Sequence, residues 1–159
     1  MKPFQIFILS LSSAGGLGYA PKAPGTFGTL AAIPLWWVMA KLEFAWMPFL
    51  GATIVFTAVA IVIANQAELI YDEHDSGKIV IDEVVGQSLV IILATSTSNN
   101  SSFQWYIYYF LIFRFFDIVK IFPCNLIDRK MKNSLGVMLD DIIAAIYSVY
   151  IPPIILMIG

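Results

Sequence analysis

Two adjacent carboxylates stand at the junction between a polar segment and an apolar run. Asp82 and Glu83 directly precede the apolar residues 84–94 in the segment SGKIVIDEVVGQSLVIILA. Acidic residues at a helix start ordinarily complement the helix dipole. Here, however, residues 71–83 contain five carboxylates and His74, the only histidine of the chain. Because carboxylates close to hydrocarbon are costly and need a partner, we predict that Asp82 and Glu83 hold a metal ion.

A second acidic pair, Asp140 and Asp141, lies in the segment NSLGVMLDDIIAAIY. Asn133 or Ser134 can cap a helix there, which places the pair beyond the first turn, where the dipole explanation is weaker. Adjacent residues on a helix point about 100° apart. One carboxylate could therefore bind metal while the other orients a ligand or meets a lysine.

A mixed cluster of charges follows the aromatic stretch near residue 110. Arg114, Asp117 and Lys120 recur every three residues and would share one helix face. One interpretation is a row of salt bridges within the helix. The other is that one carboxylate between two cations leaves a cation unpaired, which suits a bound anion. The local sequence leaves both open.

The segment YAPKAPGTFGTLAAIP, residues 19–34, has the composition of an anion-binding helix start. Free backbone N–H groups, with the hydroxyls of Thr26 and Thr29, can bind an anion at such a position, and Lys22 would add positive charge. The simpler interpretation is a Pro/Gly turn with a threonine cap.

These four clusters together describe a magnesium and phosphate site. Mg²⁺ takes hard oxygen ligands and substrate phosphate oxygens, and Cys124 is the only cysteine, so a thiolate cluster is excluded. The predicted metal ligands are Asp82, Glu83, Asp117, Asp140 and Asp141. The predicted catalytic residues are Asp75, Asp82, Glu83, Asp117 and His74, with Asp75 or His74 exchanging protons with water or the leaving oxygen. The predicted substrate-binding residues are Lys22, Thr26, Gly28, Thr29, Arg114 and Lys120.

The composition indicates a membrane protein. Of the 159 residues, 59% are hydrophobic and only 13% are charged, and the mean hydropathy is +0.81. Soluble domains are about half apolar and about a quarter charged. The length predicts one domain over residues 1–159. The net charge of −2 gives no reason to expect nucleic acid as a partner.

Five apolar stretches predict an all-α polytopic protein, a compact bundle of about four to five hydrophobic helices. They are Leu30–Ala40, Phe49–Ile70, Val84–Ala94, Trp105–Phe116 and Ile142–Ile158. Pro152 and Pro153 should kink the last helix or end its regular part, and residues 95–102 should form a polar turn. The N-terminal segment is too short to cross a bilayer, and Pro21 disfavours signal cleavage after Ala20, so we predict a re-entrant or interfacial segment.

If the five stretches alternate across a membrane, residues 13–28, 71–83 and 117–141 share one face. Nine of the eleven acidic residues and most of the basic ones fall there, whereas Lys41 is the only basic residue in a connection on the other face. The positive-inside rule makes the charged face cytoplasmic.

With these residues in view, the sequence resembles the phosphatidylglycerophosphatase A family. The blocks PKAPGTFGTLAAIPL, HDSGKIVIDEVVGQ, FRFFDIVKIFP and GVMLDDIIAAI match in order and spacing over about half of the chain. The resemblance implies an all-helical lipid phosphatase of the bacterial inner membrane. It would convert phosphatidylglycerophosphate to phosphatidylglycerol and phosphate with Mg²⁺.

Two positions depart from the family pattern. Ser76 and Ile121 stand where the family usually has proline, which affects loop stiffness more than chemistry. The family's charged motif positions map onto Asp75, Asp82, Glu83, Arg114, Asp117, Lys120, Asp140 and Asp141. Lys22, Thr26, Gly28 and Thr29 match the first block.

Other phosphatase chemistries lack their residues here. A cysteine phosphatase needs arginine at a different spacing from that of Cys124 and Arg129, a phosphohistidine enzyme needs two histidines, and Asp-x-Asp does not occur. Metal-assisted hydrolysis remains, with a covalent aspartyl phosphoenzyme still open.

The competing class is a non-enzymatic ion-coupled carrier or lipid-binding membrane protein, and a soluble helical relative is a third possibility. A carrier would place ionisable groups near the bilayer midplane and often contains repeats, neither of which the sequence predicts.

Overall fold

A computed structural model of the chain describes residues 1–42, 46–97 and 102–158, and within these ranges the regular structure is entirely helical. The elements are α1 (Pro3–Ser12), η1 (Leu17–Tyr19), α2 (Pro24–Leu30), α3 (Ile33–Leu42), α4 (Trp46–Tyr71), α5 (Ile81–Thr97), α6 (Phe103–Val119), α7 (Cys124–Lys130) and α8 (Ser134–Ile158). The predicted all-helical class is confirmed. The five predicted apolar stretches correspond to α3, α4, α5, α6 and α8.

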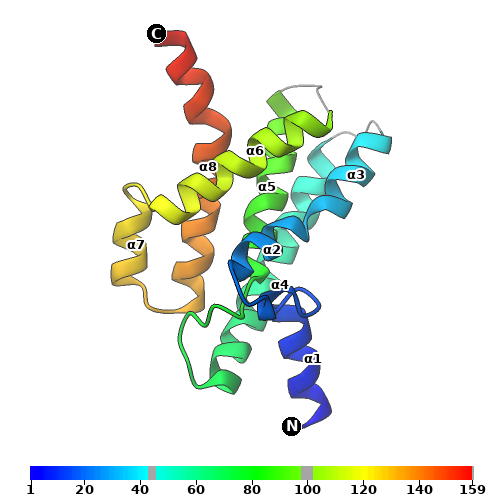
Figure 1. The fold of residues 1–159 in the computed structure, drawn as a ribbon, viewed down its shortest axis with the longest axis vertical. Helices are drawn as coiled ribbons and strands as arrows, with labels where there is room; N and C mark the ends of the chain where they lie inside the picture. Colours follow the sequence, from blue (N-terminus) through cyan, green and yellow to red (C-terminus); the bar gives the residue numbers. More distant parts are fainter. Residues whose placement is uncertain (43–45, 98–101, 159) are drawn as a thin grey trace.

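Helix α5 is the centre of the bundle. It contacts α2, α4, α6 and α8 (Figure 1), and both its apolar residues and its small residues are buried. Neighbouring helices approach α5 closely at Gly86, because a Cβ built there would lie 2.5 Å from Cζ of Phe113 and 3.3 Å from Cβ of Asp141. A glycine one turn after the acidic pair therefore lets α6 and α8 approach α5 at the depth of the charged residues.

The polar ends of several helices lie at the same end of the molecule. The C-terminal end of α4 and the first turns of α5 and α8 all lie in the lower half of Figure 1. The α4–α5 connection is irregular around Ser76 and Gly77. Asn133 caps α8, since its Oδ1 accepts a hydrogen bond from the Gly136 N–H at 2.9 Å. Segments far apart in the sequence thus bring their charged residues to one place.

Within the described ranges, two helices are long and apolar enough to cross a membrane, α4 and the portion Ser134–Pro153 of α8. The most apolar window of α4 has a mean hydropathy of 2.3, yet only 22% of it is buried. Val55, Val62 and Leu69 are more than half exposed, so α4 presents a largely apolar surface outside the bundle core. The total number of spans and the re-entrant N-terminal segment remain predictions; α1 is a short apolar helix that contacts α4.

The ends of α5 and α8 differ from the predictions. Helix α8 continues through Pro152 and Pro153 to Ile158, so the expectation that the prolines end it is wrong; proline inside apolar helices is tolerated when the surroundings compensate for the lost hydrogen bond. The predicted polar turn at 95–102 is wrong for residues 95–97, which belong to α5. There the hydroxyls of Thr95, Ser96 and Thr97 donate to backbone carbonyls at 2.7, 2.6 and 2.9 Å. Residues 98–101 lie outside the described ranges.

The close approach at Gly86 predicts a specific loss of stability. Replacing Gly86 with Ala would force Phe113 and α8 away from α5, and we expect a loss of about 1–3 kcal/mol in unfolding free energy. Thermal unfolding of the purified protein in detergent measures it. Gly51→Ala is the matched control in α4, because a Cβ there meets no atom within 4 Å. A Gly86→Ala protein as stable as the Gly51→Ala protein would contradict the close approach.

Candidate active site

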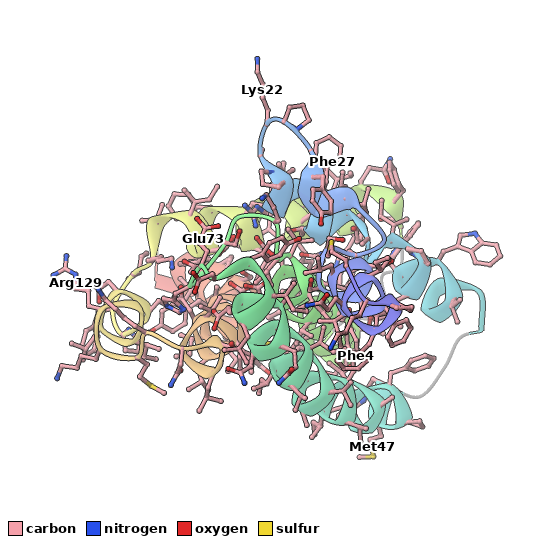
Figure 2. The ribbon with its side chains drawn as sticks, turned by 90° about the horizontal axis from the view of Figure 1, so that it is seen from below. Phe4, Lys22, Phe27, Met47, Glu73 and Arg129 are labelled. Atoms are coloured by element: carbon pink, nitrogen blue, oxygen red, sulfur yellow. The ribbon has the colours of Figure 1, made fainter. Side chains whose placement is uncertain are left out.

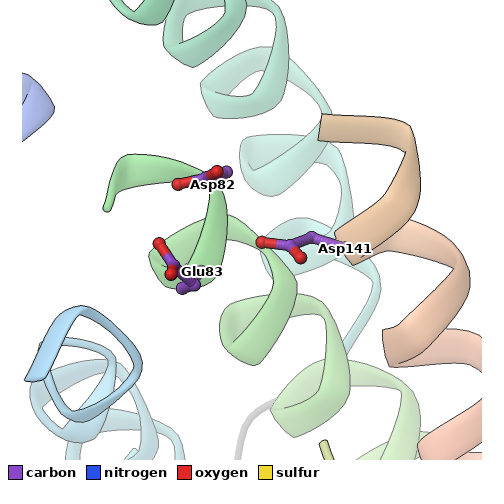
Figure 3. Close-up of side chains that lie close together, drawn as sticks. All are labelled: Asp82, Glu83 and Asp141. Atoms are coloured by element: carbon purple, nitrogen blue, oxygen red, sulfur yellow. The ribbon is translucent and has the colours of Figure 1, made fainter. Parts of the chain in front are cut away.

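Three carboxylates converge from α5 and α8. Asp82 and Glu83 lie in the first turn of α5, and Asp141 reaches toward them from α8 (Figure 3). One carboxylate oxygen from each residue lies within 4.8 Å of the other two. Asp82 is 7% exposed and Asp141 only 3%. Oxygen ligands at these separations can share one cation.

Each of these carboxylates has an oxygen with no hydrogen-bond partner among the described residues. The atoms are Oδ1 of Asp82, Oε2 of Glu83 and Oδ2 of Asp141, and all three are buried. A buried anionic oxygen without a partner is costly, so native structures rarely leave one without an ion or water. Hard, anionic oxygen donors are the ligands that Mg²⁺ prefers. The residues present therefore fit a divalent cation of this kind.

The pKa values of Asp82 and Glu83 are both raised, which indicates buried negative charge that the neighbouring side chains compensate only in part. Burial is the main reason that the pKa of Asp82 is raised to about 6; hydrogen bonds to the ionised form oppose this shift, and the charge of Asp75 contributes to it. Burial, followed by the charge of Asp82, also raises the pKa of Glu83 well above its usual value, while Arg114 lowers it. Because close carboxylates disfavour one another's ionisation, a cation among them would favour the ionised forms.

Arg114 connects α6 with α2 and α5. Its Nη1 forms an ion pair with Asp117 and lies 3.9 Å from Oε1 of Glu83. The same nitrogen donates a hydrogen bond to Oγ1 of Thr29 at 3.3 Å, and the Thr29 hydroxyl donates to the Gly25 carbonyl at 2.9 Å. The Arg114 side chain is 14% exposed. A guanidinium held in this way is a fixed positive charge at the edge of the acidic cluster.

The predicted residues of α2 have mixed outcomes. A Cβ at Gly25 would lie 2.1 Å from Oε1 of Glu83, and one at Gly28 would lie 2.6 Å from Cβ of Val80. Gly28 therefore permits close approach of α2 to the start of α5, and the buried Thr29 hydroxyl serves Arg114. Thr26 has its backbone N–H bonded to the Ala23 carbonyl, as part of the first turn of α2. These residues are near the site, but their predicted contact with substrate stays a prediction.

Lys22 is not brought to the acidic cluster. It is exposed at the tip of the connection before α2 and projects away from the helices (Figure 2). The predicted role of Lys22 in holding the phosphate therefore gains no support from its position.

Lys120 pairs with Asp140, the first aspartate of the acidic pair in α8. Its Nζ lies 2.8 Å from Oδ2 of Asp140, so Asp140 and Asp141 point to different partners, as adjacent helical residues must. Of the two interpretations left open for these charges, the one in which a cation remains unpaired is wrong, because Arg114 pairs with Asp117 and Lys120 with Asp140. The second carboxylate, that of Asp140, comes from α8 across the helix interface. The sequence around residues 114–120 alone could not predict this pairing.

The two residues predicted to transfer protons, His74 and Asp75, have different neighbours in the structure. His74 is 39% exposed, and its Nδ1 lies 2.9 Å from Oε1 of Glu68. Asp75 lies with Asp82, Glu68 and Ser134 around a small pocket beside the acidic cluster. Asp75 is thus the residue closer to the carboxylates, whereas His74 faces Glu68.

Sequence reasoning missed two residues near the site, Glu68 and Gln87. Glu68, near the end of α4, contacts the 74–75 segment and α8. Gln87 is fully buried one turn after Glu83, and neither of its amide atoms has a partner among the described residues. Two signals in the sequence could have indicated them. Glu68 is an acid inside the most apolar stretch, and Gln87 is a polar residue four positions after the predicted ligand Glu83.

Comparison with known proteins identifies the family. The phosphatidylglycerophosphatase A family model matches residues 10–156. Phosphatidylglycerophosphatase A of Haemophilus influenzae is 37% identical over 142 residues, covering 86% of this chain and 80% of that protein. Phosphatidylglycerophosphatase A of Escherichia coli is 34% identical over 133 residues, covering 84% and 74%. A Bacteroides thetaiotaomicron protein named as a putative phosphatidylinositol-3-phosphatase is 39% identical over 155 residues, covering 93% and 92%.

The chain belongs to the phosphatidylglycerophosphatase A family, and it is a phosphatase. No solved structure is significantly similar to it.

The contacts of Arg114 predict that lysine cannot replace it. Arg114→Lys keeps the charge but shortens the side chain by one atom and loses the planar guanidinium, whose Nη1 contacts Asp117 and Thr29. We therefore expect at least about a tenfold loss of phosphatase activity, equivalent to ~1.4 kcal/mol. Phosphate release by purified protein measures it. Arg129→Lys is the matched control, because Arg129 is exposed on α7 and projects outward (Figure 2). Equal activity of the two variants would show that the Arg114 contacts are dispensable.

Proposed function

We propose that the protein removes the terminal phosphate of phosphatidylglycerophosphate, giving phosphatidylglycerol and inorganic phosphate. The names of the Haemophilus and Escherichia relatives support this substrate. The observation that carries the chemistry is the convergence of Asp82, Glu83 and Asp141 with unpaired oxygens, next to the fixed cation of Arg114.

Asp82, Glu83 and Asp141 are the residues that would hold Mg²⁺. Once bound, the ion supplies Lewis acidity toward the phosphoryl group and its attacking water. Asp117 and Asp140, also predicted as ligands, are occupied by Arg114 and Lys120, so we assign them to positioning these cations. The five carboxylates exceed the two cationic side chains that pair with them, which favours an additional positive charge.

The remaining chemistry falls to side chains around the cluster. Arg114 and Lys120 would offset negative charge on the phosphoryl oxygens as the bond to water forms and the bond to the glycerol oxygen breaks. Asp75 would accept the proton of the attacking water, and the leaving oxygen would take up a proton. Asp75 is favoured over His74 because it lines the pocket with Asp82.

We further propose that the enzyme is a multi-pass protein of the bacterial inner membrane with this site facing the cytoplasm. The exposed apolar surface of α4 would contact acyl chains. The substrate headgroup would then enter at the polar helix ends while its acyl chains stay in the bilayer. The predicted excess of basic residues on that face gives the orientation.

A second candidate substrate is a phosphatidylinositol 3-phosphate. The Bacteroides relative named for that activity aligns with 93% of this chain at 39% identity. Both lipids present a phosphomonoester on a diacylglycerol-based headgroup, so the same carboxylates and cations could act on either. The two lipids differ in the leaving alcohol, which is a primary alcohol in phosphatidylglycerophosphate and a ring alcohol in phosphatidylinositol 3-phosphate.

Metal removal tests the proposed chemistry. We expect purified protein to release phosphate from phosphatidylglycerophosphate vesicles with Mg²⁺, and to lose this activity in EDTA. Asp82→Asn and Asp141→Asn should each lower kcat by at least about a hundredfold, because each removes an anionic ligand. Asp72→Asn, at an exposed loop position, is the control. Full activity in EDTA would refute the metal, and binding of the lipid without turnover would favour the carrier or lipid-binding class.

Labelling tests the orientation. In a Cys124→Ala background, which removes the only native cysteine, single cysteines replace Arg129 and Met47, both exposed. We expect a membrane-impermeant thiol reagent added to intact cells to label position 47 and not position 129. Opening the inner membrane should make position 129 reactive. The reverse pattern would place the site on the outer face.

A further inference from the structure

Glu68 joins three separate segments with its carboxylate. Oε1 lies 2.9 Å from Nδ1 of His74 and accepts the Asp75 backbone N–H at 3.3 Å. Oε2 accepts the Ser134 hydroxyl at 2.8 Å. A carboxylate accepts but does not donate, so Nδ1 of His74 must carry the proton. The side chain, 14% exposed, therefore ties the end of α4 to the 74–75 segment and to the first residue of α8.

These contacts hold an unfavourable backbone conformation in place. Asp75 has a positive φ of 50°, a region that costs free energy for a residue with a Cβ. Its N–H is directed at Glu68, and the residue lines the same small pocket as Glu68, Ser134 and Asp82. Release of the N–H would remove an interaction that keeps Asp75 in this conformation.

Glu68 differs from the carboxylates of the acidic cluster in being satisfied. Both of its oxygens have partners from the protein, whereas Asp82, Glu83 and Asp141 each keep a buried oxygen without one. Oε1 has two partners and Oε2 has one, so three of the roughly four lone-pair sites of the carboxylate are already in use. Its geometry is that of a support for neighbouring residues.

We propose that Glu68 is a positioning residue of the phosphatase site, which holds the 74–75 segment against the start of α8 so that Asp75 stays beside Asp82. The consequence for catalysis rests on the proposed function, in which Asp75 exchanges protons with the water. The expected effect of Glu68 on hydrogen exchange in residues 72–80 does not depend on the proposed function.

Three variants at two positions separate this role from others. Glu68→Ala removes all three contacts, whereas Glu68→Gln keeps the shape and an acceptor oxygen without the charge. Glu73→Ala is the matched control, because Glu73 is an exposed acid of the same connection, labelled in Figure 2. Its backbone N–H donates a hydrogen bond to the Glu68 carbonyl at 3.3 Å, and truncating the side chain leaves that bond possible.

Hydrogen–deuterium exchange of residues 72–80 in the purified protein gives the first measurement, and kcat and KM for the hydrolysed lipid give the second. For Glu68→Ala we expect faster exchange in this loop and a kcat lowered by about tenfold to a hundredfold, as for a displaced catalytic group, with KM within about twofold. Glu68→Gln should recover most of kcat. Glu73→Ala should match the unaltered protein in both measurements.

The outcomes are distinguishable. Unchanged exchange in Glu68→Ala overturns the proposal, and so does a Glu68→Gln protein as inactive as Glu68→Ala, which would indicate a required charge, as in a metal ligand. If Glu68→Ala does not fold, Ser134→Ala removes only the Oε2 contact and should still raise exchange in the loop. If the unaltered protein hydrolyses neither lipid, the proposed substrates fail, while the exchange measurement still decides whether Glu68 holds the loop.

Discussion

The structure depends on the compensation of negative charge at the end of an apolar helix bundle. Asp82, Glu83, Asp117, Asp140 and Asp141 come together from three helices, at positions with little access to water. Burying ionised carboxylates costs far more than a single contact returns unless each gains a partner. Arg114 and Lys120 compensate part of this charge. The arrangement of α2, α6 and α8 around α5 follows from the need to bring these partners together.

The same constraint divides the acids by what they touch. Asp117 and Asp140 pair with cations, and Glu68 accepts hydrogen bonds from three residues. Asp82, Glu83 and Asp141 instead keep buried oxygens without partners. A satisfied carboxylate stabilises the helices it joins, whereas an unsatisfied one retains capacity for a ligand. The neighbours of each carboxylate therefore decide whether it is satisfied within the protein or keeps an oxygen without a partner among the described residues.

Small residues make this convergence possible. Gly25 allows α2 to approach Glu83, and Gly86 allows α6 and α8 to approach α5. A side chain at either position would occupy space within van der Waals contact of a functional carboxylate or of the aromatic residue beside it. Close packing between helices thus explains Gly25 and Gly86 in the matching sequence blocks.

The sequence by itself determined the helical class, the five apolar stretches, the family and the set of acids from which a site is built, because hydropathy and motif order are local properties. The tertiary structure alone decided which acids face one another. It paired Lys120 with Asp140, left Asp141 with Asp82 and Glu83, turned Lys22 outward and brought Glu68 to Asp75. These outcomes depend on how helices rotate and cross when their apolar faces pack, and the spacing of residues along one helix does not contain that information.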